Sequence, residues 1–198
     1  MANELELKAV VRDLDALRAA LGRAGATRVF RGMMRDRRLD RAGHLVANDR
    51  ILRLRTYEAE AGGAHSELTW KRRTVTTPAG YKQSEELECG VDNGTSALAI
   101  FQALGYEVVH AIDRFVEVWR HVDAGARLEW YPRMDLLLEI EGSPQGMEHL
   151  IVALGLDRRE CLPDTLTEFA ARYAARTRQR AVWTEAELSG AAPGWHNA

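Results

Sequence analysis

The sequence has few of the residues that would cross-link a structure or anchor it in a membrane. It holds only two cysteines, Cys89 and Cys161, and no CxxC pair, which argues against a disulfide framework and a thiolate zinc site. No apolar run approaches the roughly 18 residues needed to cross a bilayer. Residues 1–4 already include an acid and carry no signal-peptide core. We therefore expect a cytoplasmic protein that does not associate with membranes.

Several common catalytic motifs are also missing. The sequence contains no GxxxxGK(S/T) loop, no GxGxxG turn, no GxSxG elbow and no HExxH pair. The usual scaffolds for nucleotide binding, acyl transfer and zinc proteolysis are therefore unsupported. The six histidines occur singly along the chain, and none is predicted to be a metal ligand.

What remains is an ordinary globular composition with an unusual split among the basic residues. The chain has 198 residues, 46% of them hydrophobic and 28% charged, with a formal net charge of −2. This length suffices for one domain with a sizeable core. Lys and Arg together number 27, but only Lys8, Lys71 and Lys82 are lysines. A compact ammonium and a guanidinium fork are not interchangeable, and all three lysines fall within the motifs described below.

Helix and strand signals alternate along the chain. Helices are predicted from the cap Asp13, from 93–96, from Ser143-Pro144, and from Pro163-Asp164 toward about Arg180, while 189–194 reads as a loop-like, disordered tail. Strands are predicted by period-two alternation at 4–10, 51–57, 66–73, 81–89, 112–121, 126–131 and 136–142. Long strands interrupted by a few helices indicate an α+β fold with a mostly antiparallel sheet.

Most of these strands carry one apolar and one charged face. Glu4, Glu6 and Lys8 share a face opposite Leu5 and Leu7, because residues two apart point the same way. The same holds, with both signs of charge, for these further sets: Arg53 and Arg55; Thr69, Lys71 and Arg73; Lys82, Ser84, Glu86 and Glu88; Glu139 and Glu141.

Two arrangements explain this pattern. In an open sheet the charged face meets water, and opposite charges pair across strands. In a closed barrel the charged faces line the interior, which is costly unless an occupant neutralises them. Clustered Lys and Arg then require a polyanion, and clustered carboxylates require a divalent cation. A metal-bound polyphosphate meets both requirements.

The order of the charged motifs resembles the CYTH domain, or triphosphate tunnel metalloenzyme, family. Glu4-Leu5-Glu6-Leu7-Lys8 matches its ExExK signature, and further motifs follow in the family's order over residues 3 to about 176. They are Asp36-Arg37-Arg38-Leu39-Asp40, Leu52-Arg53-Leu54-Arg55, Thr69-Trp70-Lys71, Glu86-Leu87-Glu88 and Leu138-Glu139-Ile140-Glu141.

The resemblance implies a fold and a set of roles. The fold would be a closed antiparallel eight-stranded β-barrel, a tunnel with helices packed outside, spanning 1–177 and followed by a tail at 178–198. Lys8, Arg53, Arg55, Lys71, Lys82 and Arg114 would bind a triphosphate. Glu4, Glu6, Glu129, Glu139 and Glu141 would hold Mg²⁺ or Mn²⁺, with Glu4, Glu6 and Lys8 catalytic and Glu86 and Glu88 in either role.

The implied activity is metal-dependent hydrolysis of inorganic or organic triphosphates. A class IV-type adenylate cyclase and a catalytically weak polyphosphate-binding module are the alternatives, and a homodimer is compatible with the fold. Ser84 and Val116 stand where many members carry a basic residue, and Glu129 replaces a common aspartate. The five arginines between 31 and 41 are interrupted by Asp36 and Asp40. We therefore expect them at the barrel rim or tunnel mouth and expect no nucleic-acid partner.

Overall fold

The computed structural model describes residues 2–72, 74–122 and 124–197. Arg73, which the sequence places at the end of a strand, lies outside these residues. The strands are β1 (Ala2–Val10), β2 (Thr27–Asp40), β3 (Ile51–Ala59), β4 (Ala64–Lys71), β5 (Val75–Thr76), β6 (Lys82–Val91), β7 (Glu107–Arg120), β8 (Ala124–Trp130) and β9 (Leu137–Gly142).

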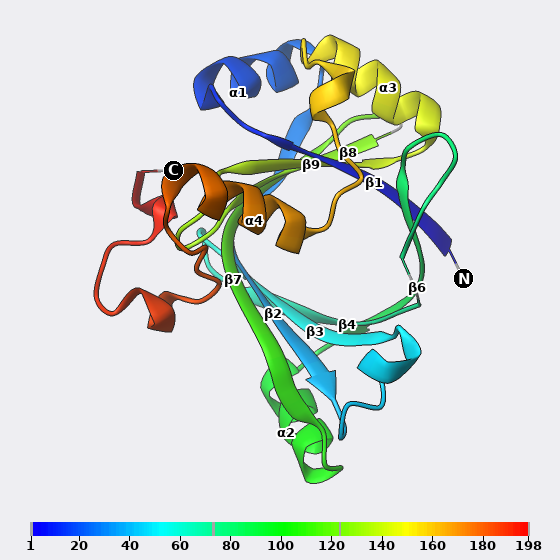
Figure 1. Cartoon of the computed structure of the whole chain (residues 1–198), viewed down its shortest axis with the longest axis vertical. Helices are drawn as coiled ribbons and strands as arrows, with labels where there is room; N and C mark the ends of the chain where they lie inside the picture. The colour runs from blue at the N-terminus through cyan, green and yellow to red at the C-terminus, as the bar shows by residue number, and fades with distance from the viewer. Residues whose placement is uncertain (1, 73, 123, 198) are drawn as a thin grey trace.

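Eight of these strands close into an antiparallel barrel (Figure 1). The sheet order is β1-β9-β8-β7-β2-β3-β4-β6, and β6 returns to β1. Closure works because β1 pairs with β6 over Ala2–Glu6 and with β9 over Glu6–Val10. Among the described residues, the short β5 pairs with β6 alone. The predicted α+β fold with a closed eight-stranded barrel is confirmed.

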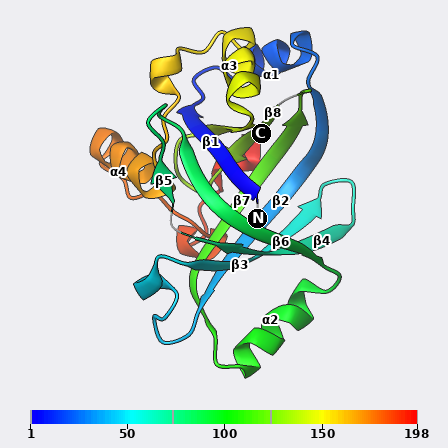
Figure 2. The ribbon, with the colours of Figure 1, turned by 90° about the vertical axis from the view of Figure 1, so that its right-hand side faces the viewer.

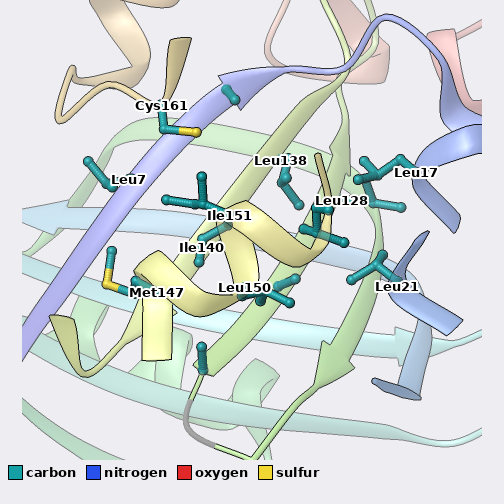
Figure 3. Close-up of a cluster of buried hydrophobic side chains, with 14 of the residues drawn as sticks. Leu7, Leu17, Leu21, Leu128, Leu138, Ile140, Met147, Leu150, Ile151 and Cys161 are labelled. Atoms are coloured by element: carbon teal, nitrogen blue, oxygen red, sulfur yellow. The ribbon is translucent and has the colours of Figure 1, made fainter. Parts of the chain in front are cut away.

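Two helices cover one side of the barrel with apolar side chains. They are α1 (Leu14–Arg23), capped by Asp13, and α3 (Pro144–Ala153), capped by Ser143 with Pro144 in its first turn. Figure 3 shows the core between them and the outer faces of β1, β8 and β9. This core includes the following buried residues: Leu7, Leu17, Leu21, Leu128, Leu138, Ile140, Met147, Leu150 and Ile151. The apolar strand faces therefore point outward, and the charged faces point into the barrel.

The other two helices are placed differently. Helix α2 (Gly94–Ala103), capped by Asn93, lies against β3 and β4 (Figure 2) and has no buried residue. Helix α4 (Leu166–Thr177) begins at the cap Thr165, after the predicted Pro163-Asp164 start, and ends before the predicted Arg180. In the view of Figure 1, α4 lies in front of the barrel, between the wall of β1, β8 and β9 and that of β2, β3 and β4. Among the described residues, no helix is long and apolar enough to cross a membrane.

The chain after α4 returns to the barrel. Ala181 and Val182 are buried, and Val182 forms a β-bridge with Arg133. Trp183 packs edge-on against Tyr131 and accepts a hydrogen bond from the amide of Asp113 at its carbonyl. The first part of the segment that we assigned to the tail is therefore packed onto the barrel.

Candidate functional site

A cavity of about 800 Å³ lies inside the barrel and is lined by side chains from all eight barrel strands. Twelve of the thirteen predicted site residues line it: Glu4, Glu6, Lys8, Arg53, Arg55, Lys71, Lys82, Glu86, Glu88, Arg114, Glu139 and Glu141. The strand alternation explains this, since each of these residues shares the inward face of its strand. The charged faces that the sequence showed thus line one interior.

Asp36 on β2 organises the arginines in this interior. Its carboxylate accepts two hydrogen bonds from Arg55, at 2.6 and 3.0 Å, and one from Arg114. Arg53 is farther away, with 3.8 Å between its Nη1 and Asp36 Oδ2. Burial acts to raise the pKa of Asp36, but the charges of Arg55, Arg114 and Arg53 hold that pKa well below its usual range. Asp36 is therefore ionised and fixes two guanidinium groups in the tunnel.

Glu129 is the predicted metal ligand that does not line the cavity. It is fully buried and accepts hydrogen bonds from Arg114 at 2.7 Å, Arg127 at 2.9 Å and the Tyr131 hydroxyl at 2.6 Å. Burial acts to raise its pKa, but Arg114, Lys8 and Arg127 lower it well below the ordinary value. These contacts occupy the carboxylate and leave it as the anchor of two arginines.

The lysines are paired with carboxylates of neighbouring strands. Lys8 contacts Glu139 closely and lies 3.8 Å from Glu6, and Lys82 donates to Glu6. Burial is the main cause that lowers the pKa of Lys8 to about 8. Burial acts to raise the pKa of Glu6, but Lys8 and Lys82 lower it to about 2.

A second lysine cluster joins β4, β6 and β1. Lys71 donates to Glu86 and, at 3.2 Å, to Glu4, while the Ser84 hydroxyl donates to Glu86 at 2.7 Å. Burial and a hydrogen bond with Glu4 raise the pKa of Glu86 to about 7. Ser84 therefore supplies an uncharged hydrogen-bond donor to the Glu86 carboxyl group.

The carboxylates near β1 have the donor chemistry of a Mg²⁺ or Mn²⁺ site. Glu6 and Glu141 are register partners on β1 and β9. Burial first, and then the charges of Glu4 and Glu6, raise the pKa of Glu141 against the effect of Arg127. Carboxylate oxygens are the ligands that these cations prefer. Within the described ranges no three such side chains converge tightly enough to hold an ion.

Sequence reasoning missed five charged residues of the cavity lining, namely Asp36, Arg38, Glu67, Arg120 and Arg127. Arg127 donates to Glu129 and Glu139, and its register partner on β7 is Val118, two residues after Val116. The period-two spacing could have predicted Arg127 as a cavity residue, because Arg127 stands two residues before Glu129 on the same strand face. Trp119 contributes to the cavity lining and also packs against the outer core, in which Trp130 is buried.

Comparison with known proteins gives a structural likeness and no sequence match. No family model matches the sequence, and no curated protein does. The PH1012 protein of Pyrococcus horikoshii OT3 has a TM-score of 0.65 at 19% identity, covering 84% of this chain and 98% of its own. A candidate adenylate cyclase of Vibrio parahaemolyticus has a TM-score of 0.68 at 17% identity, with 85% and 97% covered.

A third structure has a stated activity. HpAC1 from Hippeastrum, a candidate adenylyl cyclase with a dominant triphosphatase activity, has a TM-score of 0.62 at 17% identity, with 90% of this chain and 97% of its own covered. At identities this low the likeness concerns the fold. The chain thus has the barrel fold of proteins that include candidate adenylate cyclases and a triphosphatase.

Proposed function

We propose that the protein is a metal-dependent hydrolase of inorganic or organic triphosphates, which bind in the barrel cavity. The observation that carries this proposal is the mixed charge of the cavity wall, to which every barrel strand contributes. A polyanion alone would leave the carboxylates without a counter-ion, and a cation alone would leave the lysines and arginines without one. A metal–polyphosphate complex pairs with both sets.

The side chains divide into three roles. Lys8, Arg53, Arg55, Lys71, Lys82 and Arg114, joined by Arg127, would bind the phosphate oxygens. Glu4, Glu6, Glu139 and Glu141 would hold Mg²⁺ or Mn²⁺, and Glu86 and Glu88 would assist either group. Glu129 and Asp36 position the arginines. The bound metal would neutralise charge that develops on the phosphoryl group and orient the attacking water.

A polyphosphate-binding protein without turnover is the second candidate. Val116 faces the interior beside Glu129 and is fully buried, and Ser84 likewise offers no charge. Arg127 offsets part of this loss, so hydrolysis remains the stronger proposal. HpAC1, which shares the fold, has triphosphatase activity. For the cavity of this protein, the competing proposal is synthesis of cyclic AMP from ATP.

The test is phosphate release from tripolyphosphate, ATP and thiamine triphosphate, with Mg²⁺, with Mn²⁺ and with EDTA. The double variant Glu4→Gln/Glu6→Gln should lose about 100-fold or more of the metal-dependent rate, because metal assistance is worth several kcal/mol. Glu85→Gln is the matched control, since Glu85 neighbours Glu86 on β6 but pairs with Arg72 and does not line the cavity. Absence of phosphate from all three substrates would overturn the hydrolase, and cyclic AMP formed from ATP would identify a cyclase.

A further inference from the structure

The four arginines around Asp36 outnumber the three carboxylates that pair with them. Arg55 and Arg114 take both oxygens of Asp36 at hydrogen-bond distance. Arg114 has Glu129 as a second partner, and Arg55 has Glu67 at 3.5 Å. Arg38 and Arg53 also face this carboxylate, but neither has an acidic oxygen at hydrogen-bond distance among the described residues.

Arg38 has basic neighbours on both sides in the sheet. Its register partner on β3 is Arg53, and its register partner on β7 is His110. Directly opposed like charges on a sheet are destabilising. Burial and the charges of Arg114 and Arg55 lower the pKa of Arg38 despite Asp36, and burial and Arg38 lower the pKa of His110. This row of the sheet therefore has an uncompensated positive charge.

Arg53 lies in the barrel interior, and its hydrogen-bond donors are not all paired. The Arg53 side chain is 11% exposed and donates to Thr69 at 3.2 Å. Its Nε is buried and has no hydrogen-bond partner. Buried polar groups of this kind are costly unless an anion or a water meets them. Both side chains line the cavity.

We propose that Arg38 and Arg53 form an anion subsite that binds a phosphoryl group of the polyphosphate without the help of a divalent metal. The inference rests on the proposed function for the choice of ligand, and it adds Arg38 as a binding residue. A phosphoryl group fits because it presents several acceptor oxygens to two guanidinium forks. The carboxylates that would hold the metal lie on other strands. The Arg38–Arg53 subsite is therefore positively charged and accessible when no metal is bound.

The experiment compares Arg38→Met with Arg37→Met in EDTA. Arg37 is the matched control, because it directly precedes Arg38 on β2, points to the opposite face and pairs with Asp113 at 2.9 Å. Tripolyphosphate is titrated calorimetrically into each protein, and the thermal midpoint is recorded with and without it. We expect the wild type and Arg37→Met to bind with similar affinity, and Arg38→Met to bind about 10- to 100-fold more weakly, as expected when one charge-assisted contact is lost. Arg38→Lys should recover part of this loss.

A second readout separates ligand binding from a structural role. Removing a repelled cation should leave the ligand-free thermal midpoint of Arg38→Met equal to or above that of the wild type, whereas loss of a structural contact would lower it. Equal tripolyphosphate affinity for Arg38→Met and wild type would overturn the subsite, as would no binding by the wild type in EDTA. Binding in EDTA without phosphate release in Mg²⁺ would keep the subsite and overturn only the hydrolase.

Discussion

Asp36 is the residue on which the positions of the tunnel arginines depend most. It is 3% exposed and bonded to Arg55 and Arg114. In Asp36→Asn these buried cations lose their shared counter-ion, and breaking a buried pair in this way costs about 3–5 kcal/mol. Urea denaturation should show that loss, and tripolyphosphate should restore more stability to the variant than to the wild type. Asp164→Asn, which breaks the more exposed pair with Arg172, should cost less than about 1 kcal/mol. Similar costs for the two variants would contradict this role.

Single residues also show where sequence reasoning succeeds and where it stops. Period-two spacing placed Glu4, Glu6 and Lys8 on one face, and all three line the cavity. The same spacing does not reveal that Glu129 is sealed behind Arg114 and Arg127, because that depends on which strands become neighbours. Likewise, the sequence of the Arg-rich stretch 31–41 does not predict which arginines face the cavity. Arg38 lines the cavity, whereas Arg37 pairs with Asp113 outside it.

Helices α2 and α3 have similar lengths but differ in how they are anchored. Leu150 of α3 is fully buried, whereas Ile100 of α2 is 60% exposed and α2 has no buried residue. Leu150→Ala should therefore cost about 2–5 kcal/mol of the free energy of unfolding, and Ile100→Ala less than about 0.5 kcal/mol. Amide exchange should be faster throughout α2 than in α3, since local opening exposes little apolar surface there. Equal protection of the two helices would contradict this reading.

Element boundaries were predicted well where a capping residue marks them and less well elsewhere. Asp13, Asn93 and Ser143 cap helices as the sequence indicated. Thr165 competes with Pro163-Asp164 for the start of α4, and its reciprocal bonds with Glu168 decide the outcome. Strand β2 was not among the strands predicted by alternation, and its pairing with β7 has register shifts between Arg28 and Phe30 and between Arg38 and Leu39.

At the scale of the whole molecule, folding encloses many charges that stay ionised only because their partners are enclosed with them. Four enclosed carboxylates on β1, β2 and β8 have pKa values below their ordinary ones, namely Glu4, Glu6, Asp36 and Glu129. Glu86 differs, since its raised pKa of about 7 makes it titrate near neutrality. The interior therefore couples the stability of the barrel to pH.

Acidification should unfold the barrel by protonating these enclosed carboxylates. A carboxylate with a lowered folded pKa contributes stability above its unfolded pKa and loses that contribution as the pH falls through the folded value. For Glu6 this window runs from 4.5 down to about 2. Urea denaturation at about pH 5 and about pH 3 should show a marked fall in the free energy of unfolding. The fall should be smaller in Glu6→Gln, which cannot gain that proton, and unchanged in the outward-facing control Glu85→Gln. Equal falls in wild type and Glu6→Gln would show that Glu6 does not share in the coupling.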